Sequence, residues 1–167
     1  NASYSHGAMV TLTATPSTGS DFTGWDGACT GTGDCVVTMD QVRSVSATFT
    51  LRQYTLTVTR NGTGTGTVSS TPAGVTCGAS GACTGTFNHG TVVQLVGNPA
   101  ASSDFTMWMG AGCSGNGTCN VTMTAATTVP AYFTLKQHVL TTSVAGSGSG
   151  TVTSNPTGIS CSKTGGT

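Results

Sequence analysis

Seven cysteines are the residues of this 167-residue chain best suited to chemistry, and six of them fall in pairs that are separated by five residues. These pairs are Cys29/Cys35, Cys77/Cys83 and Cys113/Cys119. Short loops of this kind across Gly-rich turns favour disulfides, because zinc sites use closer cysteines with a second pair or a histidine nearby. We predict three disulfides, each stabilising by about 2 kcal/mol in the chain-entropy model. Cys161 is then unpaired or bonded to another repeat.

Disulfides persist in oxidising compartments, so the cysteine pattern predicts an extracellular or cell-surface protein. The composition is almost uncharged, with five basic and five acidic residues and no glutamate. It therefore offers no basic patch for nucleic acid. No apolar run reaches the roughly 18 residues of a membrane span, and we expect no membrane insertion in this segment.

Histidines and aspartates recur at equivalent positions, which raises the question of a metal or catalytic site. His6 and His89 each precede a glycine, and Asp21 and Asp104 each precede Phe-Thr. No carboxylate or nucleophile recurs beside both histidines, and one carboxylate per repeat is poor provision for calcium, which takes about 6–8 oxygens. We interpret the histidines as turn residues and the aspartates as turn caps. The chain is predicted to have no metal, no cofactor and no catalytic residues, and so not to be an enzyme.

Two tryptophans offer the remaining candidate for a site. Trp25 and Trp108 occupy equivalent positions after Phe-Thr, and Met109 follows the second one. Trp108 and Met109 could form a binding face for a glycan or a partner protein. The alternative, which we favour, is that the indoles fill the centre of each repeat beside the cysteine pair.

A long internal repeat positions all of these residues. Residues 53–56 and 62–68 return 84 residues later as 137–140 and 146–152. A fixed long period is the signature of a tandem array. We therefore divide the chain into a first segment, residues 1–52, that is the C-terminal part of a repeat; a complete copy, residues 53–136; and a third segment, residues 137–167, that is the N-terminal part of a further repeat.

The first and third segments complement each other in sequence. Joined head to tail, they give a repeat of normal length, because Cys161 to His6 through the junction spans as many residues as Cys77 to His89. Only the cysteine opposite Cys161 is missing, at Thr167 or beyond. We expect either a window on a longer tandem protein or a subunit whose split repeat is completed by a neighbour, with residues 138–167 pairing with residues 1–52 of the next unit.

Within one repeat the apolar residues alternate with threonines, as in Tyr54, Leu56 and Val58, so that one strand face packs and the other meets water. Asn-Gly and Gly-x-Gly turns separate these strands. The predicted fold is all-β, with at most one helical turn over 123–128 and over 39–44. Pro130 cannot donate to a ladder, so we expect it either on a sheet edge or at a position whose N–H would point outward.

Taken together, these motifs resemble a known family, the divergent internalin-B-type B-repeat, also called the bacterial repeat domain. The motifs are 72–77, 83–87, 105–108, 110–113, 119–123 and 129–133 in the complete copy, and 22–25, 27–29, 35–39 and 45–49 in the first segment. Met107 and Met109 depart from the first segment, which has Gly24 and Asp26 there. The resemblance implies a compact, β-grasp-like module repeated in tandem on large secreted or surface-anchored bacterial proteins. It implies no catalytic residues.

Three functions fit this reading. The first is a non-catalytic structural repeat of an extracellular filament, fibre or surface stalk, whose partners are copies of itself head to tail or adjacent repeats of one longer chain. The second is an adhesin module that binds a glycan or a host protein. The third is an accessory repeat region of a large secreted enzyme with its catalytic part elsewhere.

Overall fold

The computed structural model describes residues 2–77 and 82–165 and is all-β, with no helix in those residues. The predicted fold class is confirmed. The single helical turns considered at 39–44 and 123–128 are not formed there. Met123 instead exchanges backbone hydrogen bonds with Thr91 and Gly90, which commits its amide to a neighbouring strand connection. Contacts divide the chain into two compact units, Asn1–Lys136 and Gln137–Thr167.

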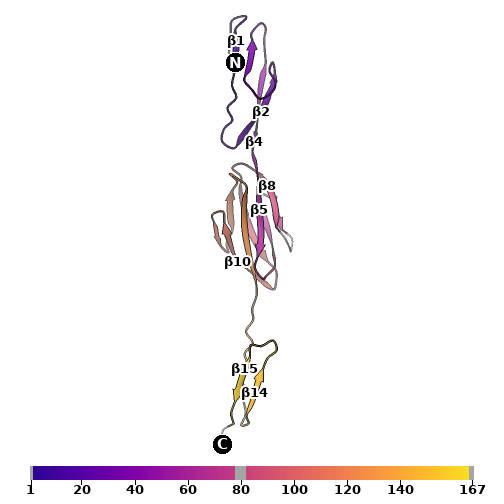
Figure 1. The fold of residues 1–167 in the computed structure, drawn as a ribbon, viewed down its shortest axis with the longest axis vertical. Helices are drawn as coiled ribbons and strands as arrows, with labels where there is room; N and C mark the ends of the chain where they lie inside the picture. Colours follow the sequence, from indigo (N-terminus) through magenta and orange to yellow (C-terminus); the bar gives the residue numbers. More distant parts are fainter. Residues whose placement is uncertain (1, 78–81, 166–167) are drawn as a thin grey trace. The chain divides into compact units, whose positions relative to one another are not determined.

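The complete copy is a sandwich of two sheets (Figure 1). The five-stranded sheet has the order β11-β10-β13-β5-β8 and the four-stranded sheet the order β12-β9-β6-β7. The first sheet comprises β5 (Gln53–Asn61), β8 (Cys83–Asn88), β10 (Ser103–Gly110), β11 (Cys113–Gly115) and β13 (Thr127–Leu135). The second comprises β6 (Gly66–Thr71), β7 (Thr76–Cys77), β9 (Val92–Pro99) and β12 (Cys119–Thr122).

The first and last strands of the complete copy, β5 and β13, lie side by side and parallel in the middle of the five-stranded sheet. Every other pairing is antiparallel. Of the two alternatives for Pro130, the edge strand is wrong, because β13 is central. The ladder between β13 and β10 ends at the neighbouring pair Ala131–Trp108, so Pro130 lies outside that ladder.

The core between the two sheets consists of the alternating apolar residues of both. Leu56, Val58, Leu95 and Val129 are completely buried there. The one buried polar side chain, Ser103, accepts a hydrogen bond from the backbone amide of Thr65 at 2.9 Å. A buried hydroxyl with a partner costs little, so this side chain is compatible with the apolar core.

The first segment repeats the later strands of this sandwich. It comprises β1 (Met9–Leu12), β2 (Ser20–Gly27), β3 (Cys35–Thr38) and β4 (Val45–Leu51). β1 pairs with β3 and β2 with β4, in the registers that β9–β12 and β10–β13 use. Trp25 faces Ala47, for instance, as Trp108 faces Ala131.

The third segment forms a hairpin of β14 (Gly150–Thr153) and β15 (Ser160–Lys163). Its pairing of Val152 with Cys161 repeats that of Val68 with Cys77 between β6 and β7.

The described chain contains no long apolar helix of the kind that crosses a bilayer.

The alternation along β5 gives a direct test of the sandwich core. We expect Leu56→Ala to lower the free energy of unfolding by about 2–5 kcal/mol, because it removes a completely buried side chain from the central strand. Thr55→Ala, on the exposed face one residue earlier, should cost less than about 1 kcal/mol. Urea unfolding followed by intrinsic tryptophan fluorescence would measure both. Equal effects would contradict the assignment of the buried face.

Candidate binding surface

Each of the three cysteine pairs forms a disulfide in the structure. Two of these disulfides lie in the complete copy, and each of the two connects one sheet to the other. Cys77 of β7 bonds Cys83 of β8, and Cys113 of β11 bonds Cys119 of β12. Their Cα atoms lie 5.3 Å apart in both bonds, within the range that a disulfide bridges. The disulfides therefore hold the sandwich closed at two places. The third bond, Cys29–Cys35, repeats the second of these in the first segment.

Cys161 is the one free cysteine of the described chain and is half-buried in the third segment. Its Sγ lies 3.5 Å from the hydroxyl of Thr142. Thr167, the residue considered at the position of its partner, lies outside the described residues. No metal site forms around it, since no three His, Cys, Asp or Glu side chains gather anywhere in the described residues.

Trp108 is a core residue, which corrects the alternative that it lies on an exposed binding face. Its side chain is 1% exposed, and its ring centroid lies 4.8 Å from that of Phe105. The indole Nε1 donates to the carbonyl of Gly117 at 2.7 Å, so the ring is tied to the disulfide loop that follows. Met109, the other residue of that alternative, is exposed. Met107, which precedes Trp108 in the sequence, is exposed as well.

The histidines occupy different environments. The ring of His89 packs against Tyr54, with 5.9 Å between the centroids, and lies directly over Gly19. His6, near the beginning of the first segment, is exposed. His138, which replaces Tyr54 in the next repeat, is exposed as well. None of the three belongs to a group of three or more His, Cys, Asp or Glu side chains that could hold a metal ion in the described structure.

Arg52 forms the joint between the first segment and the complete copy. It is the single residue between β4 and β5. Its amide donates to the carbonyl of Gly19 at 2.8 Å, and its carbonyl accepts from the amide of His89 at 2.7 Å. Its guanidinium pairs with Asp21 at 2.8 Å, and this hydrogen bond raises the pKa of Arg52. The backbone of Arg52 thus connects the two repeats, and its side chain adds an ion pair with the first segment.

Two of these contacts, the amide hydrogen bond and the ion pair to the preceding repeat, recur at the end of the complete copy. The amide of Lys136 donates to the carbonyl of Ser102 at 2.9 Å, and its ammonium lies 3.9 Å from the carboxylate of Asp104. Asp21 and Asp104 are therefore partners of the linking cation in each repeat. The sequence held the signal for this, since Arg52 and Lys136 also recur at the repeat spacing, but the interpretation as turn caps missed it.

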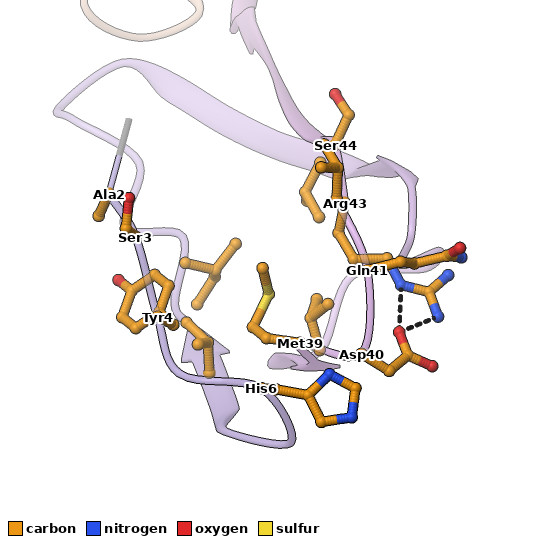
Figure 2. Close-up of a pocket in the computed structure, with 14 residues that line it drawn as sticks. Ala2, Ser3, Tyr4, His6, Met39, Asp40, Gln41, Arg43 and Ser44 are labelled. Carbon is orange, nitrogen blue, oxygen red and sulfur yellow. Dashed lines mark hydrogen bonds and ion pairs between the residues drawn. The ribbon is translucent and has the colours of Figure 1, made fainter.

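An open apolar hollow of about 890 Å³ lies in the first segment (Figure 2). Figure 2 shows Tyr4 on one side and the ion pair of Asp40 with Arg43 on the other, with Met39 between them. The apolar side chains that line it are Tyr4, Val10, Leu12, Val37, Met39, Val42 and Val45. The ion pair of Arg43 with Asp40, at 2.7 Å, lies at the rim, and its hydrogen bonds hold the pKa of Asp40 below its ordinary value.

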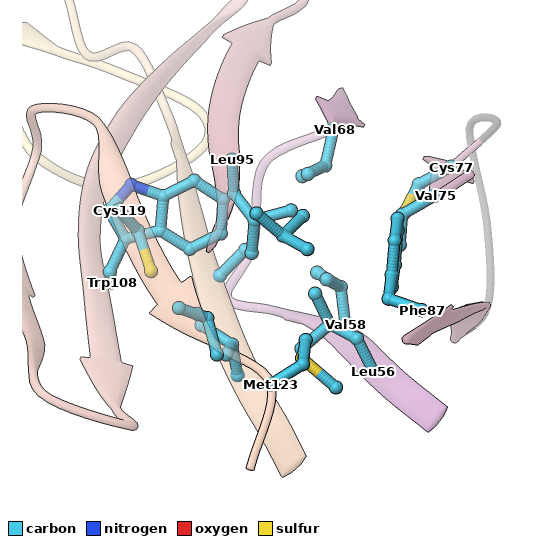
Figure 3. Close-up of a cluster of buried hydrophobic side chains, with 14 of the residues drawn as sticks. Leu56, Val58, Val68, Val75, Cys77, Phe87, Leu95, Trp108, Cys119 and Met123 are labelled. Atoms are coloured by element: carbon cyan, nitrogen blue, oxygen red, sulfur yellow. The ribbon is translucent and has the colours of Figure 1, made fainter. Parts of the chain in front are cut away.

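The apolar side chains of this hollow, apart from Val42, are the counterparts of buried core residues in the complete copy (Figure 3). Tyr4, for instance, is 52% exposed where its counterpart Phe87 is 6% exposed. Phe49 of β4, outside the hollow, is likewise 46% exposed where Phe133 is 1% exposed. Figure 3 shows what fills the space in the complete copy, namely the side chains of β5 and β6 such as Leu56. The first segment has no such strands, so its core face is uncovered.

Comparison with known proteins gives a family for most of the chain. A family model described as "Divergent InlB B-repeat domain" matches residues 1–53 and again residues 54–137. The chain matches no curated protein and no solved structure.

The joint makes a prediction about Gly19, which is buried with a φ of +78°. A Cβ at this position would overlap the imidazole ring of His89. We expect Gly19→Ala to cost about 1 kcal/mol for the left-handed backbone and a further 1–3 kcal/mol, roughly, for the overlap. Chemical unfolding of the whole chain would measure the loss.

Gly31→Ala is the matched control, because Gly31 has a φ of +83° and open space around it. It should show the backbone cost alone. Adding His89→Ala to Gly19→Ala should recover the second part of the loss. If the two alanine variants lose the same stability, the ring of His89 does not pack on Gly19.

Proposed function

The chain belongs to the divergent InlB B-repeat family, and from this premise we propose that it is a non-catalytic structural segment of a tandem β-repeat array outside the cell, in a fibre or a surface stalk. The observation that carries the proposal is the recurring joint. Arg52 with Asp21 and Lys136 with Asp104 occupy the same place in successive repeats. A joint of constant chemistry is what a chain needs to add repeats in one fixed manner.

The linkers between repeats support a mechanical rather than a catalytic role. Only Arg52 separates β4 from β5, and both of its backbone groups are bonded to the adjoining repeats. Arrays in which each repeat contacts only its neighbours gain stability from these interfaces. A linker of one residue, bonded on both sides, restricts the orientation of neighbouring repeats far more than a flexible loop would.

The disulfides support the extracellular location. All six cysteines of the complete copy and first segment are bonded, which an oxidising compartment favours and the cytosol does not. The chain also has few charged residues and many threonines, so its electrostatic interactions with its surroundings are weak. Both properties fit a secreted or surface-attached protein.

An antibody against the complete copy would test this function. We expect immunogold electron microscopy of the producing cells to place the label along extracellular fibres or on the cell surface. Preimmune serum is the control, and thiol alkylation before reduction should leave the six bonded cysteines unmodified. Label confined to the cytoplasm, with those cysteines reduced, would overturn the proposal.

A second candidate, an adhesin module, is favoured by one observation. Met107 and Met109 are 40% and 49% exposed on the outer face of β10, and exposed methionines suit adaptable binding surfaces. We expect a glycan array to show no specific ligand for the chain. Binding that Met109→Ala abolishes, while Val92→Ala on the other sheet preserves it, would favour the adhesin instead. Val92 is the control because its exposure is similar, 55% against 49% for Met109.

A further inference from the structure

We infer that the hollow of residues 1–52 is the docking site for residues 137–163 of a second copy of this chain, which complete the first segment as β5, β6 and β7 complete the middle repeat. The inference rests on the proposed array and names the partner that extends it. It assigns a function to the hollow of the first segment and to the exposed third segment.

The complete copy is the template for the docked state. In it β5 pairs in parallel with β13, and β6 pairs antiparallel with β9. The first segment has the counterparts of β13 and β9, namely β4 and β1, and each pairs with only one neighbour, β2 and β3 respectively. Each therefore keeps a free edge toward the hollow. An unpaired edge beside an apolar face is a surface to which a strand adds readily.

The hairpin of the donor segment already has the shape that this site requires, whereas residues 137–145, the counterparts of β5, form a strand only on docking. The hydroxyl of Ser154 donates to the carbonyl of Pro156 at 2.8 Å and accepts from the amide of Ile159 at 2.9 Å. In the complete copy, Ser70 makes the same two bonds at the same lengths, to Pro72 and from Val75. The β14–β15 hairpin also keeps the register of β6–β7. A preorganised donor loses less conformational entropy on binding.

Apolar side chains of the donor match the hollow in position. Leu140 is 72% exposed and Val152 is 39% exposed, whereas their counterparts Leu56 and Val68 are 0% and 1% exposed. Ile159 corresponds to Val75, which is 1% exposed. The donor would thus bury against the hollow the three side chains that its equivalent buries in the complete copy.

Val139, the residue before Leu140, distinguishes specific docking from nonspecific hydrophobic association. Val139 is 94% exposed, more than Leu140, but it corresponds to Thr55, which faces solvent in the complete copy. A nonspecific apolar association would use both side chains. Docking by the template buries Leu140 and leaves Val139 in water.

The first experiment measures association of the 167-residue chain by sedimentation velocity over a range of concentrations. We expect head-to-tail oligomers that lengthen with concentration. Leu140→Asp should weaken the association at least about 100-fold, because it places a charge in an apolar site. Val139→Asp should leave it unchanged. A chain that stays monomeric at every concentration, or equal loss in both variants, would overturn the inference.

Mixing two variants tests the polarity of the contact. Leu140→Asp removes the donor and keeps the hollow, and Leu12→Asp blocks the hollow and keeps the donor. Each variant alone should be monomeric, and an equal mixture should form two-chain complexes and nothing longer. Complexes of more than two chains, or of one variant with itself, would contradict donor-to-hollow docking.

Cross-linking tests the register and does not depend on the Leu12 variant folding. The pairing of Thr59 with Pro130 in the complete copy corresponds to Ser143 with Ser46 across the contact. In a Cys161→Ser background, Ser143→Cys with Ser46→Cys should oxidise to a ladder of covalent multimers. Ser143→Cys with Thr50→Cys, which lies four residues along β4 or about 13 Å away, should not. A bond within one chain, or equal yields for the two pairs, would overturn the inference.

The outcome for native material separates this inference from the proposed function. Native material that is held together by this docking should separate into individual chains when it is denatured without reduction. One covalent polypeptide many repeats long would overturn the role of a second copy, yet it would leave the extracellular array intact. Cytoplasmic label in the immunogold experiment would overturn the array whatever the association behaviour.

Discussion

The parallel pairing of β5 with β13 is the constraint on which the complete copy depends. It joins the first and last strands of the repeat in the centre of one sheet. Parallel neighbours cannot be linked by a tight turn, so the whole intervening chain must fold over them as a crossover. Leu56 and Val129, on these two strands, are both completely buried beneath that crossover. The repeat therefore closes as a unit, and any piece that has one of the two strands exposes its half of the core.

The two disulfides of the complete copy compensate for the small size of this core. Each connects the five-stranded to the four-stranded sheet, one near β7 and β8 and one near β11 and β12. A module of this length buries a modest fraction of its surface and gains from covalent closure. Trp108 connects the Cys113–Cys119 disulfide loop to the core, because its indole is buried and also donates a hydrogen bond to that loop. This disulfide and the aromatic pair of Phe105 with Trp108 therefore stabilise the same part of the repeat.

Local sequence patterns predict the strands and the disulfides of this chain, but they do not predict which strands pair with one another. The alternation of Leu56 and Val58 with threonines predicted strands, because side chains on a strand alternate between faces. Cysteine spacing predicted the disulfides for an equally local reason. The central position of Pro130 was missed, since no short-range signal tells which strand another will pair with. The joint at Arg52 and the hollow beside Met39 were missed for the same reason, as both depend on residues of different strands, and in the hollow on strands that the first segment does not contain.

The parallel pair also decides how the repeat responds to tension. The chain enters the complete copy at Gln53, at the beginning of β5, and leaves it at Leu135, at the end of β13. Because the strands run in the same direction, these two points lie at opposite ends of their shared ladder. A pull on the chain slides the strands lengthwise and loads all of their hydrogen bonds at once, rather than opening them one after another as in a peeled hairpin. A repeat built in this way resists extension in the direction in which a stalk or fibre is pulled.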